Sequence, residues 1–240
     1  IYNATAYTAV DKAENDFENA KLVNAITPAE IGKYCFKFKI GLIHISTDYV
    51  FDGEKGSDYT EEDIPNPLNV YGSTKWEGEK YVQQSGCAHL IFRTSWVYSR
   101  RKAGFLQKVI DWAKSNPELR IVDDQIGNPT WARMLAILST SFLNSSEIPD
   151  IHSFFQRYKG IYHLSGKGAA SRYDFTRTIF ENLPEGDPQK RTKIIPAKTN
   201  EFPSSAIRPV HSALNCEKFE NDFGIQIPLW QESLKLALVP

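Results

Sequence analysis

A tyrosine and a lysine stand four positions apart at Tyr71 and Lys75, and a threonine, Thr47, precedes them in the chain. These residue types suit the reduction of a carbonyl group. The tyrosine gives a proton to the carbonyl oxygen, and the Thr47 hydroxyl hydrogen-bonds the same oxygen. Lys75 lies one helical turn after Tyr71 on the same face, where we expect its charge to lower the tyrosine pKa toward working pH.

The spacing alone is weak evidence, because the chain contains a second tyrosine–lysine pair, Tyr98 and Lys102. The surroundings distinguish the two pairs. Tyr71 is followed by residues 76–82, which have the periodicity of an amphipathic helix. Tyr98 runs instead into the basic stretch 99–104, and we interpret Lys102 as a solvated side chain. The pair that begins at Tyr71 is therefore the candidate for chemistry.

Composition excludes several classes of protein. A formal net charge of −1 over 240 residues provides no general attraction to nucleic acid or to an anionic membrane. No apolar run approaches the roughly 20 residues that span a bilayer. We therefore expect neither nucleic acid nor a membrane as a partner.

The cysteines and histidines support no metal site. Cys35, Cys87 and Cys216 lie far apart and lack the spacing of a zinc cluster or of a disulfide framework. The histidines show no pair four residues apart. Three scattered cysteines suit a reducing compartment, so we expect a cytoplasmic protein without a metal.

Strands and helices alternate along most of the chain, which is typical of an α/β fold with a parallel sheet. We expect strands at 1–7, 40–45, 90–92, 119–122 and 161–164, and helices at 15–38, 70–85, 105–114, 132–143 and 173–183, with a break or restart at Pro28. Such sheets bind ligands at the carboxyl ends of their strands, where Thr8, Thr47 and the residues after Arg93 fall. The Pro- and Lys-rich stretch 184–209 and the helical runs 216–223 and 229–238 indicate a smaller domain beside the sheet.

Several motifs together carry a resemblance to a known family. They are Ala6-Tyr7-Thr8-Ala9-Val10-Asp11-Lys12-Ala13-Glu14, the run from Ser46 to Gly53, Asn66-Pro67-Leu68-Asn69-Val70-Tyr71-Gly72, Arg93-Thr94-Ser95-Trp96-Val97-Tyr98, the run from Val122 to Thr130, and Gly160-Ile161-Tyr162-His163-Leu164. In this order they resemble the dTDP-4-dehydrorhamnose reductases, which are extended short-chain dehydrogenases/reductases. The runs cover essentially the whole chain.

The resemblance implies a Rossmann-like, doubly wound parallel sheet and a smaller C-terminal substrate domain. Residues 1–98 and 131–166 would form the dinucleotide-binding domain, and residues 99–130 and 167–240 the sugar-nucleotide domain. The family's Gly-rich fingerprint is absent, so we expect the first strands of the sheet to be missing from this N-terminally truncated chain, about sixty residues in all. Ile1 also begins within an apolar run, and the one methionine is Met134.

The resemblance also implies an activity and a set of site residues. The activity is reduction of the 4-keto group of a dTDP-linked 6-deoxysugar, dTDP-4-dehydro-L-rhamnose, by NADPH or NADH, and the family allows a homodimer. Tyr71 would be the general acid, Lys75 would bind the nicotinamide ribose, and Thr47 would orient the keto oxygen. The cofactor would contact Ala6, Tyr7, Thr8, Tyr71 and Lys75, and the sugar would contact Thr47, Asp48, Tyr49 and Trp96. Asn24 matches a position that helps to hold a water near the lysine in related reductases.

Other interpretations remain for these residues and for the chain. Without the resemblance, Trp96 is equally well explained as a core residue and Asp48 as a turn cap. A non-catalytic regulatory subunit of the same fold, like the methionine adenosyltransferase beta subunit, is the alternative function, although such proteins tend to lose the runs around Tyr7 and Trp96. A sugar dehydratase is rejected, because Tyr49 replaces the glutamate that would carry its proton.

Overall fold

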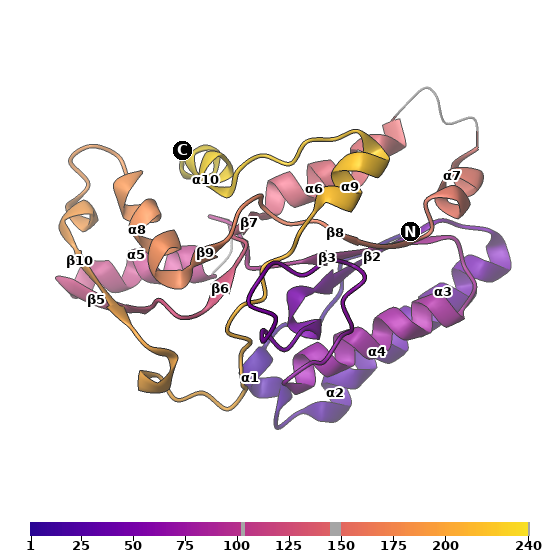
Figure 1. Cartoon of the computed structure of the whole chain (residues 1–240), viewed down its shortest axis with the longest axis horizontal. Coiled ribbons are helices and arrows are strands. Elements are labelled where there is room, and N and C mark those ends of the chain that lie inside the picture. Colours follow the sequence, from indigo (N-terminus) through magenta and orange to yellow (C-terminus); the bar gives the residue numbers. More distant parts are fainter. Residues whose placement is uncertain (102–103, 145–149, 240) are drawn as a thin grey trace.

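The computed structural model describes residues 1–101, 104–144 and 150–239. Its central layer is a sheet of four parallel strands in the order β1, β2, β3, β8 (Figure 1). These strands are Tyr2–Asn3, Leu42–Thr47, His89–Thr94 and Gly160–His163. The predicted α/β fold with a parallel sheet is confirmed.

Helices cover both faces of the central sheet, as a doubly wound fold requires (Figure 1). One face carries α2 (Phe17–Lys21), α3 (Thr27–Phe38) and α4 (Val70–Gln84), and the other carries α6 (Ala132–Ser141) and α9 (Glu217–Phe223). The remaining helices are α1 (Val10–Ala13), α5 (Phe105–Ser115), α7 (Ile151–Arg157), α8 (Arg172–Glu181) and α10 (Trp230–Leu238). Short 3-10 or π-helical turns are η1 (Leu22–Ile26), η2 (Asp48–Val50), η3 (Phe142–Asn144), η4 (Pro188–Arg191) and η5 (Thr199–Glu201).

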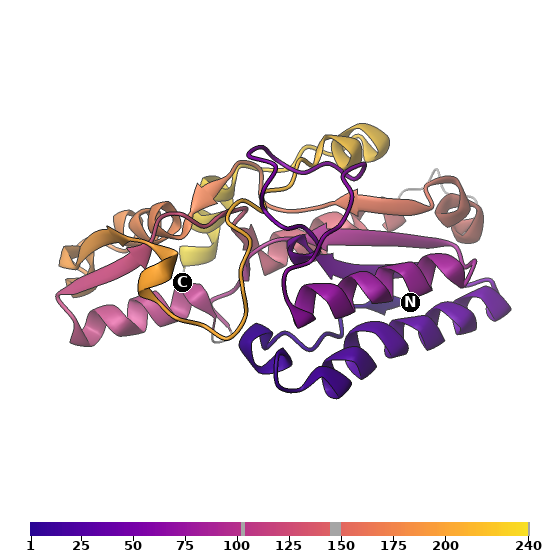
Figure 2. The same ribbon diagram turned by 60° about the horizontal axis from the view of Figure 1, so that its bottom comes forward.

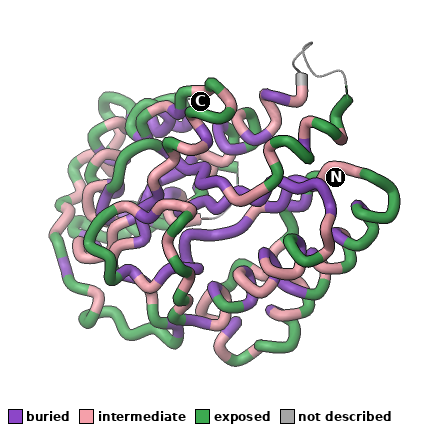
Figure 3. Tube along the Cα trace, turned by 45° about the vertical axis from the view of Figure 1, so that its right-hand side comes forward, coloured by how far each residue is buried: buried purple, intermediate pink, exposed green. Residues whose placement is uncertain are grey.

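Successive side chains of a strand point to opposite faces of the sheet, and the buried ones form two hydrophobic cores, one on each side. Leu42 and Ile91 pack against Val82 under α3 and α4. Leu90 and Phe92 pack on the opposite side, in the cluster that contains Phe219 of α9. Figure 3 shows the same arrangement, with buried residues along the central strands and exposed residues on the outer helices.

A second, smaller group of elements lies beside the central sheet. The strands β5 (Glu118–Val122) and β10 (Lys193–Ala197) form a parallel pair, against which α5 and α8 pack. This pair lies at the opposite end of the molecule from α7 (Figures 1 and 2). Two short pairs lie between the groups, β4 (Val97–Tyr98) with β7 (Thr130–Trp131) and β6 (Ile126–Gly127) with β9 (Ala170–Ser171). The division into two domains at residues 99, 131 and 167 stays a prediction.

Two expectations for the strands are corrected. The strand expected over 1–7 is limited to Tyr2–Asn3, because the backbone N–H groups of Thr5 and Tyr7 bind side chains, those of Asn3 and Asn24, and not a neighbouring strand. The strand expected at 119–122 exists but pairs with β10, outside the central sheet. β10 itself lies in the Pro- and Lys-rich stretch 184–209. Its Pro196 is tolerated because each strand of a two-stranded pair is an edge strand. At Pro28 the helix restarts, with the proline in the first turn of α3 after the π-helical turn η1.

Candidate active site

The carboxyl ends of β2 and β3 form the base of the site. Thr47 lies opposite Thr94 in the register of the two strands, so both strands end at the same edge of the sheet. After Thr47 the chain turns into η2, and the Thr47 Oγ1 caps this turn by accepting the N–H of Tyr49 at 3.2 Å. The strand end therefore presents the Thr47 hydroxyl at the position where parallel sheets bind ligands.

The start of α4 brings Tyr71 to this edge. Asn69 caps the helix by accepting the N–H of Gly72 at 2.8 Å, so Tyr71 lies in the first turn. A Cβ at position 72 would lie 2.1 Å from the Tyr49 carbonyl oxygen, which means that only glycine permits this close approach. The Thr47 and Tyr71 side chains consequently line the same cavity.

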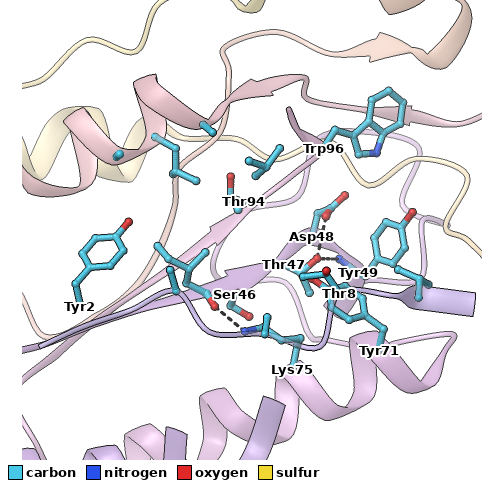
Figure 4. A pocket seen from close by; sticks show the side chains of 18 of the residues that line it. Tyr2, Thr8, Ser46, Thr47, Asp48, Tyr49, Tyr71, Lys75, Thr94 and Trp96 are labelled. Atoms are coloured by element: carbon cyan, nitrogen blue, oxygen red, sulfur yellow. Dashed lines mark hydrogen bonds between the residues drawn. The ribbon is translucent and has the colours of Figure 1, made fainter. Parts of the chain in front are cut away.

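These residues surround one cavity of about 530 Å³, shown in Figure 4. Its lining includes the predicted residues Ala6, Thr8, Thr47, Asp48, Tyr49, Tyr71, Lys75 and Trp96. Tyr7 is the predicted cofactor residue that does not line it, since its hydroxyl donates to Asp16 at 2.9 Å. The structure therefore brings together residues that lie up to about ninety positions apart in the sequence.

Burial controls the ionisation of the tyrosine and of the lysine. It raises the pKa of Tyr71 well above its usual value; the Thr47 hydroxyl lowers it, and the nearby Asp48 and Tyr49 raise it further. Burial also lowers the pKa of Lys75 to about 8, and the negative charge of Glu79 opposes this change. The expectation that Lys75 brings the pKa of Tyr71 toward working pH is therefore wrong for this structure, because desolvation of the phenol is the larger effect.

Lys75 is hydrogen-bonded to the sheet and lies one helical turn before a buried ion pair. Its Nζ donates to the Ile45 carbonyl at 2.6 Å, and the side chain is 1% exposed. One turn further along α4, Glu79 accepts from Arg93 of β3 at 3.0 Å (Nε) and 2.7 Å (Nη2), with both side chains buried. The Glu79 carboxylate offsets the positive charges of Arg93 and Lys75, and these two cations in turn stabilise the carboxylate in its buried position.

Asn24 joins two segments beside the cavity, and its expected part in holding a water near Lys75 stays a prediction. Its Oδ1 accepts the N–H of Tyr7 at 2.8 Å, and its Nδ2 donates to the Tyr7 carbonyl at 3.3 Å and to Thr74 Oγ1 at 3.1 Å. The side chain is fully buried and joins the segment around Tyr7 to α4. It thus fixes the backbone of the expected cofactor-binding segment.

Asp48 lies buried in the wall of the cavity and accepts hydrogen bonds from three hydroxyl groups. Its Oδ1 accepts from Thr47 Oγ1 at 3.1 Å, and its Oδ2 accepts from Ser95 at 2.9 Å and from Ser212 at 2.6 Å. Desolvation raises the pKa of the carboxyl group, and the three hydroxyls oppose that change. The carboxylate joins segments from three distant parts of the chain.

Trp96 forms a wall of the cavity in an unusual backbone conformation. Its φ is +44°, in the left-handed region that side chains larger than glycine seldom adopt. Gly127 packs against the ring, since a Cβ there would be 2.6 Å from a ring atom, and the Arg172 guanidinium lies 3.5 Å from the ring centre. The indole is therefore in contact with a glycine and with a cation.

Arg172 is a site residue that the sequence did not reveal. It lines the catalytic cavity and also a second cavity of about 340 Å³ that contains Trp112, Phe202 and Arg208. Tyr49 faces the guanidinium groups of both Arg172 and Arg208. Arg172 follows Ser171, the capping-box residue of α8, and no motif marks it in the sequence.

The tyrosine of the second tyrosine–lysine pair lies in the hydrophobic core. Tyr98 is 2% exposed and packs against Phe175 in the core, and Lys102 lies outside the described residues. Within the described ranges, no group of three or more His, Cys, Asp or Glu is placed to hold a metal ion. No helix of the described part is long and apolar enough to cross a membrane.

Comparison with known proteins agrees with this geometry. A family model described as the RmlD substrate binding domain matches residues 1–240. The dTDP-4-dehydrorhamnose reductase of Escherichia coli K12 is 40% identical over 240 residues, which are 99% of this chain and 78% of that protein. The crystal structure of a dTDP-4-dehydrorhamnose reductase from Clostridium acetobutylicum superposes with a TM-score of 0.88 at 34% identity, covering 99% of this chain and 79% of that one. The Bacillus anthracis enzyme, crystallised in complex with NADP, gives a TM-score of 0.86 at 31% identity with the same coverage.

The parallel sheet, with Tyr71 and Lys75 on a helix at its carboxyl edge, defines an extended short-chain dehydrogenase/reductase. Within that class, the chain belongs to the dTDP-4-dehydrorhamnose reductase family.

Proposed function

We propose that the protein containing this chain reduces the 4-keto group of dTDP-4-dehydro-L-rhamnose to dTDP-L-rhamnose with NADPH or NADH, in the cytoplasm. The observation that carries the proposal is the convergence of Tyr71, Thr47 and Lys75 on one cavity with Trp96 as its wall. Family membership supports the substrate class, because the relatives at 40% and 39% identity are dTDP-4-dehydrorhamnose reductases.

The residues that line the cavity fit a nicotinamide cofactor. Ala4, Ala6 and Thr8 form a small-residue edge along which a flat ring can lie. The Lys75 ammonium has three N–H donors, and the Ile45 carbonyl takes one of them, which leaves donors for ribose hydroxyls. When bound, the cofactor supplies the hydride that reaches C4 of the sugar.

Tyr71 completes the reduction by proton transfer. Its O–H bond breaks as a new O–H bond forms on the former keto oxygen, which carries the charge left by hydride arrival. The Thr47 hydroxyl, which lowers the pKa of Tyr71, stabilises the resulting phenolate. Because burial keeps the Tyr71 hydroxyl protonated in the resting site, the residue begins each turnover as an acid.

The second cavity offers a place for the nucleotide half of the substrate. Trp112 and Phe202 provide aromatic surfaces for a base, Arg172 lines both cavities, and Arg208 lines the second one. A diphosphate joins base and sugar in such substrates, and arginine forks match phosphate oxygens. The sugar would then lie against Trp96, between Thr47 and Tyr71.

The test compares Tyr71→Phe with Tyr98→Phe in the natural full-length protein. Tyr71→Phe removes the acid, and we expect turnover of dTDP-4-dehydrorhamnose to fall by about 10²–10⁴-fold. Tyr98→Phe deletes a buried hydroxyl for which no partner occurs among the described residues, so turnover should be nearly unchanged. Equal losses in the two variants would contradict the assignment. A wild-type protein that binds dinucleotide but reduces no nucleotide-linked ketosugar would favour the regulatory subunit.

A further inference from the structure

Asn69 connects the helix that carries Tyr71 to a distant segment of the chain. Its Oδ1 caps α4 by accepting the N–H of Gly72 at 2.8 Å, and its Nδ2 donates to the Ile207 carbonyl at 2.8 Å. A backbone N–H only donates and a carbonyl oxygen only accepts, so the amide has one possible orientation. The side chain is buried, and both of its polar atoms are paired. Asn69 is thus a fixed link between segments that lie 138 positions apart.

Residues 204–208, here called the arginine segment, end at Arg208 in the lining of the second cavity. The segment contains no helix or strand and passes beside α1 (Figure 1). Asp11 of α1 accepts from Arg208 Nη1 at 3.2 Å and Nη2 at 2.6 Å, and from the N–H of Ala206 at 3.3 Å. This ion pair takes one N–H from each terminal nitrogen, and a guanidinium has five, so donors remain for a phosphate.

The helix α1 also binds the start of α4. Glu14, the residue that ends α1, accepts the N–H of Val70 at 2.8 Å. The arginine segment is therefore joined to α1 by Asp11, α1 to α4 by Glu14, and α4 to the arginine segment by Asn69. This closed set of contacts fixes the positions of one residue from each cavity, Arg208 and Tyr71, relative to each other.

We propose that Asn69 is a positioning residue: by joining the arginine segment to the cap of α4, it sets the separation between Arg208, which binds the diphosphate, and Tyr71, which protonates the sugar. This inference rests on the proposed function, because it requires the nucleotide in the second cavity. Diphosphate and keto group belong to one substrate molecule, so both meet their partners only when Arg208 and Tyr71 have the matching separation. Loss of the link leaves the contacts of each site in place but lets their separation vary.

Two variants, Asn69→Ser and Asn69→Asp, separate the link from the cap. Serine and aspartate cap helices as well as asparagine does, but neither has an amide N–H to donate to Ile207. In the natural full-length protein, we expect kcat for the nucleotide-linked ketosugar to fall by about tenfold in both variants, because positioning supplies part of the rate enhancement. The Kd of dTDP and the Kd of the cofactor, each measured by titration, should be nearly unchanged.

Asn66→Ser is the matched control. Asn66 lies three residues before Asn69, and its Nδ2 donates to Asp52 at 3.0 Å on the exposed surface. The same substitution there removes an amide donor that does not bind the arginine segment, so kcat should stay at the wild-type value.

A double-mutant cycle distinguishes the link from a general defect of α4. Arg208→Met removes the cation that binds the diphosphate, and with it the need for a set separation. Adding Asn69→Ser to this variant should lower kcat/KM, or the single-turnover rate, little further. A defect confined to α4 would instead lower the rate by the same factor with and without Arg208.

The proposal is overturned if both Asn69 variants keep the wild-type kcat, if they lose dTDP or cofactor affinity to the same extent as kcat, or if their losses multiply with that of Arg208→Met. Circular dichroism and denaturant unfolding establish that each variant is folded. Failure of the proposed function has a different signature, because the wild type would then reduce no nucleotide-linked ketosugar, and the inference would fail with it. A wild type that reduces the ketosugar, with Asn69 variants that match it, rejects only the positioning role.

Discussion

The guanidinium of Arg172 lies 3.5 Å from the centre of the Trp96 ring, and it also lies 4.8 Å from the centre of the Phe105 ring. The cation is thus in contact with two aromatic rings where the two cavities meet. Among the described residues, no carboxylate lies within ion-pair distance of it. Its charge is consequently available to a ligand, while the contacts with the two rings favour one position for it.

Replacement of Trp96 by alanine tests the sugar side of the site. Trp96→Ala should lower kcat/KM for a nucleotide-linked 4-keto-6-deoxysugar by at least about tenfold, or roughly 1.4 kcal/mol of transition-state binding, because the ring no longer positions the sugar. Cofactor affinity, titrated separately, should be nearly unchanged. If sugar and cofactor weaken together, Trp96 is a core residue.

Gly127→Ala tests the same wall from behind. The new Cβ would lie 2.6 Å from the Trp96 ring, so the ring must shift from its position in the cavity wall. We expect KM for the sugar nucleotide to rise several-fold without loss of cofactor binding, since small displacements in a positioned site are costly. Gly56→Asn is the control, because position 56 has open space around it and asparagine tolerates its positive φ. Unchanged kinetics in Gly127→Ala would show that the Trp96 ring can move without affecting the binding of the sugar nucleotide, which contradicts the prediction.

Lys75→Met tests the burial of the ammonium group. The pKa of Lys75 is displaced from 10.5 to about 8, which at about 1.4 kcal/mol per unit costs the folded state on the order of 3 kcal/mol below pH 8. Between pH 8 and 10.5 the unfolded chain binds a proton that the folded chain lacks, so the stability of the wild type rises with pH relative to the variant. We expect Lys75→Met to be the more stable protein at pH 7, by about 1–3 kcal/mol after loss of the Ile45 hydrogen bond, and the difference to shrink by pH 10. Denaturant unfolding without cofactor measures it, with Lys80→Met as the control for loss of a lysine from α4. A difference that grows with pH would refute the direction of the displacement.

Glu79→Ala tests the buried ion pair behind the lysine. Removing this carboxylate leaves Arg93 and Lys75 buried without compensation, and we expect a loss of about 3–5 kcal/mol of unfolding free energy. The exposed pair between Lys33 and Glu30 provides the control, and Glu30→Ala should change stability by less than about 1 kcal/mol. The double variant Glu79→Leu with Arg93→Met should be more stable than Glu79→Ala alone. A single variant no weaker than Glu30→Ala would contradict the role of the pair.

The sequence predicts well the elements whose evidence is local. The helix at 70–85 appears as α4 over Val70–Gln84, because its cap and its apolar periodicity lie within the segment itself. β2 and β3 likewise agree with their apolar runs to within two residues at each end. The places of Thr47, Tyr71 and Lys75 in the fold are predicted for the same reason, because they depend only on where one strand ends and one helix begins.

What the sequence does not predict depends on contacts between distant segments. β10 is a strand because it pairs with β5, about seventy residues earlier in the chain, and its own composition hides it. Arg172 lies in the site because the start of α8 packs beside Trp96, and no residue spacing in the sequence indicates that contact. The pKa of Tyr71 was predicted in the wrong direction because spacing gives the neighbouring charge but not the extent of burial.

The bridge from Asn24 to Tyr7 and Thr74 has a consequence for how the cofactor binds. Three hydrogen bonds hold the backbone of the expected cofactor-binding segment against α4 before any ligand arrives. Little conformational entropy remains for that segment to lose on binding, so association there should proceed without a slow ordering step. We therefore expect the backbone around Tyr7 to keep the same conformation with and without a bound ligand.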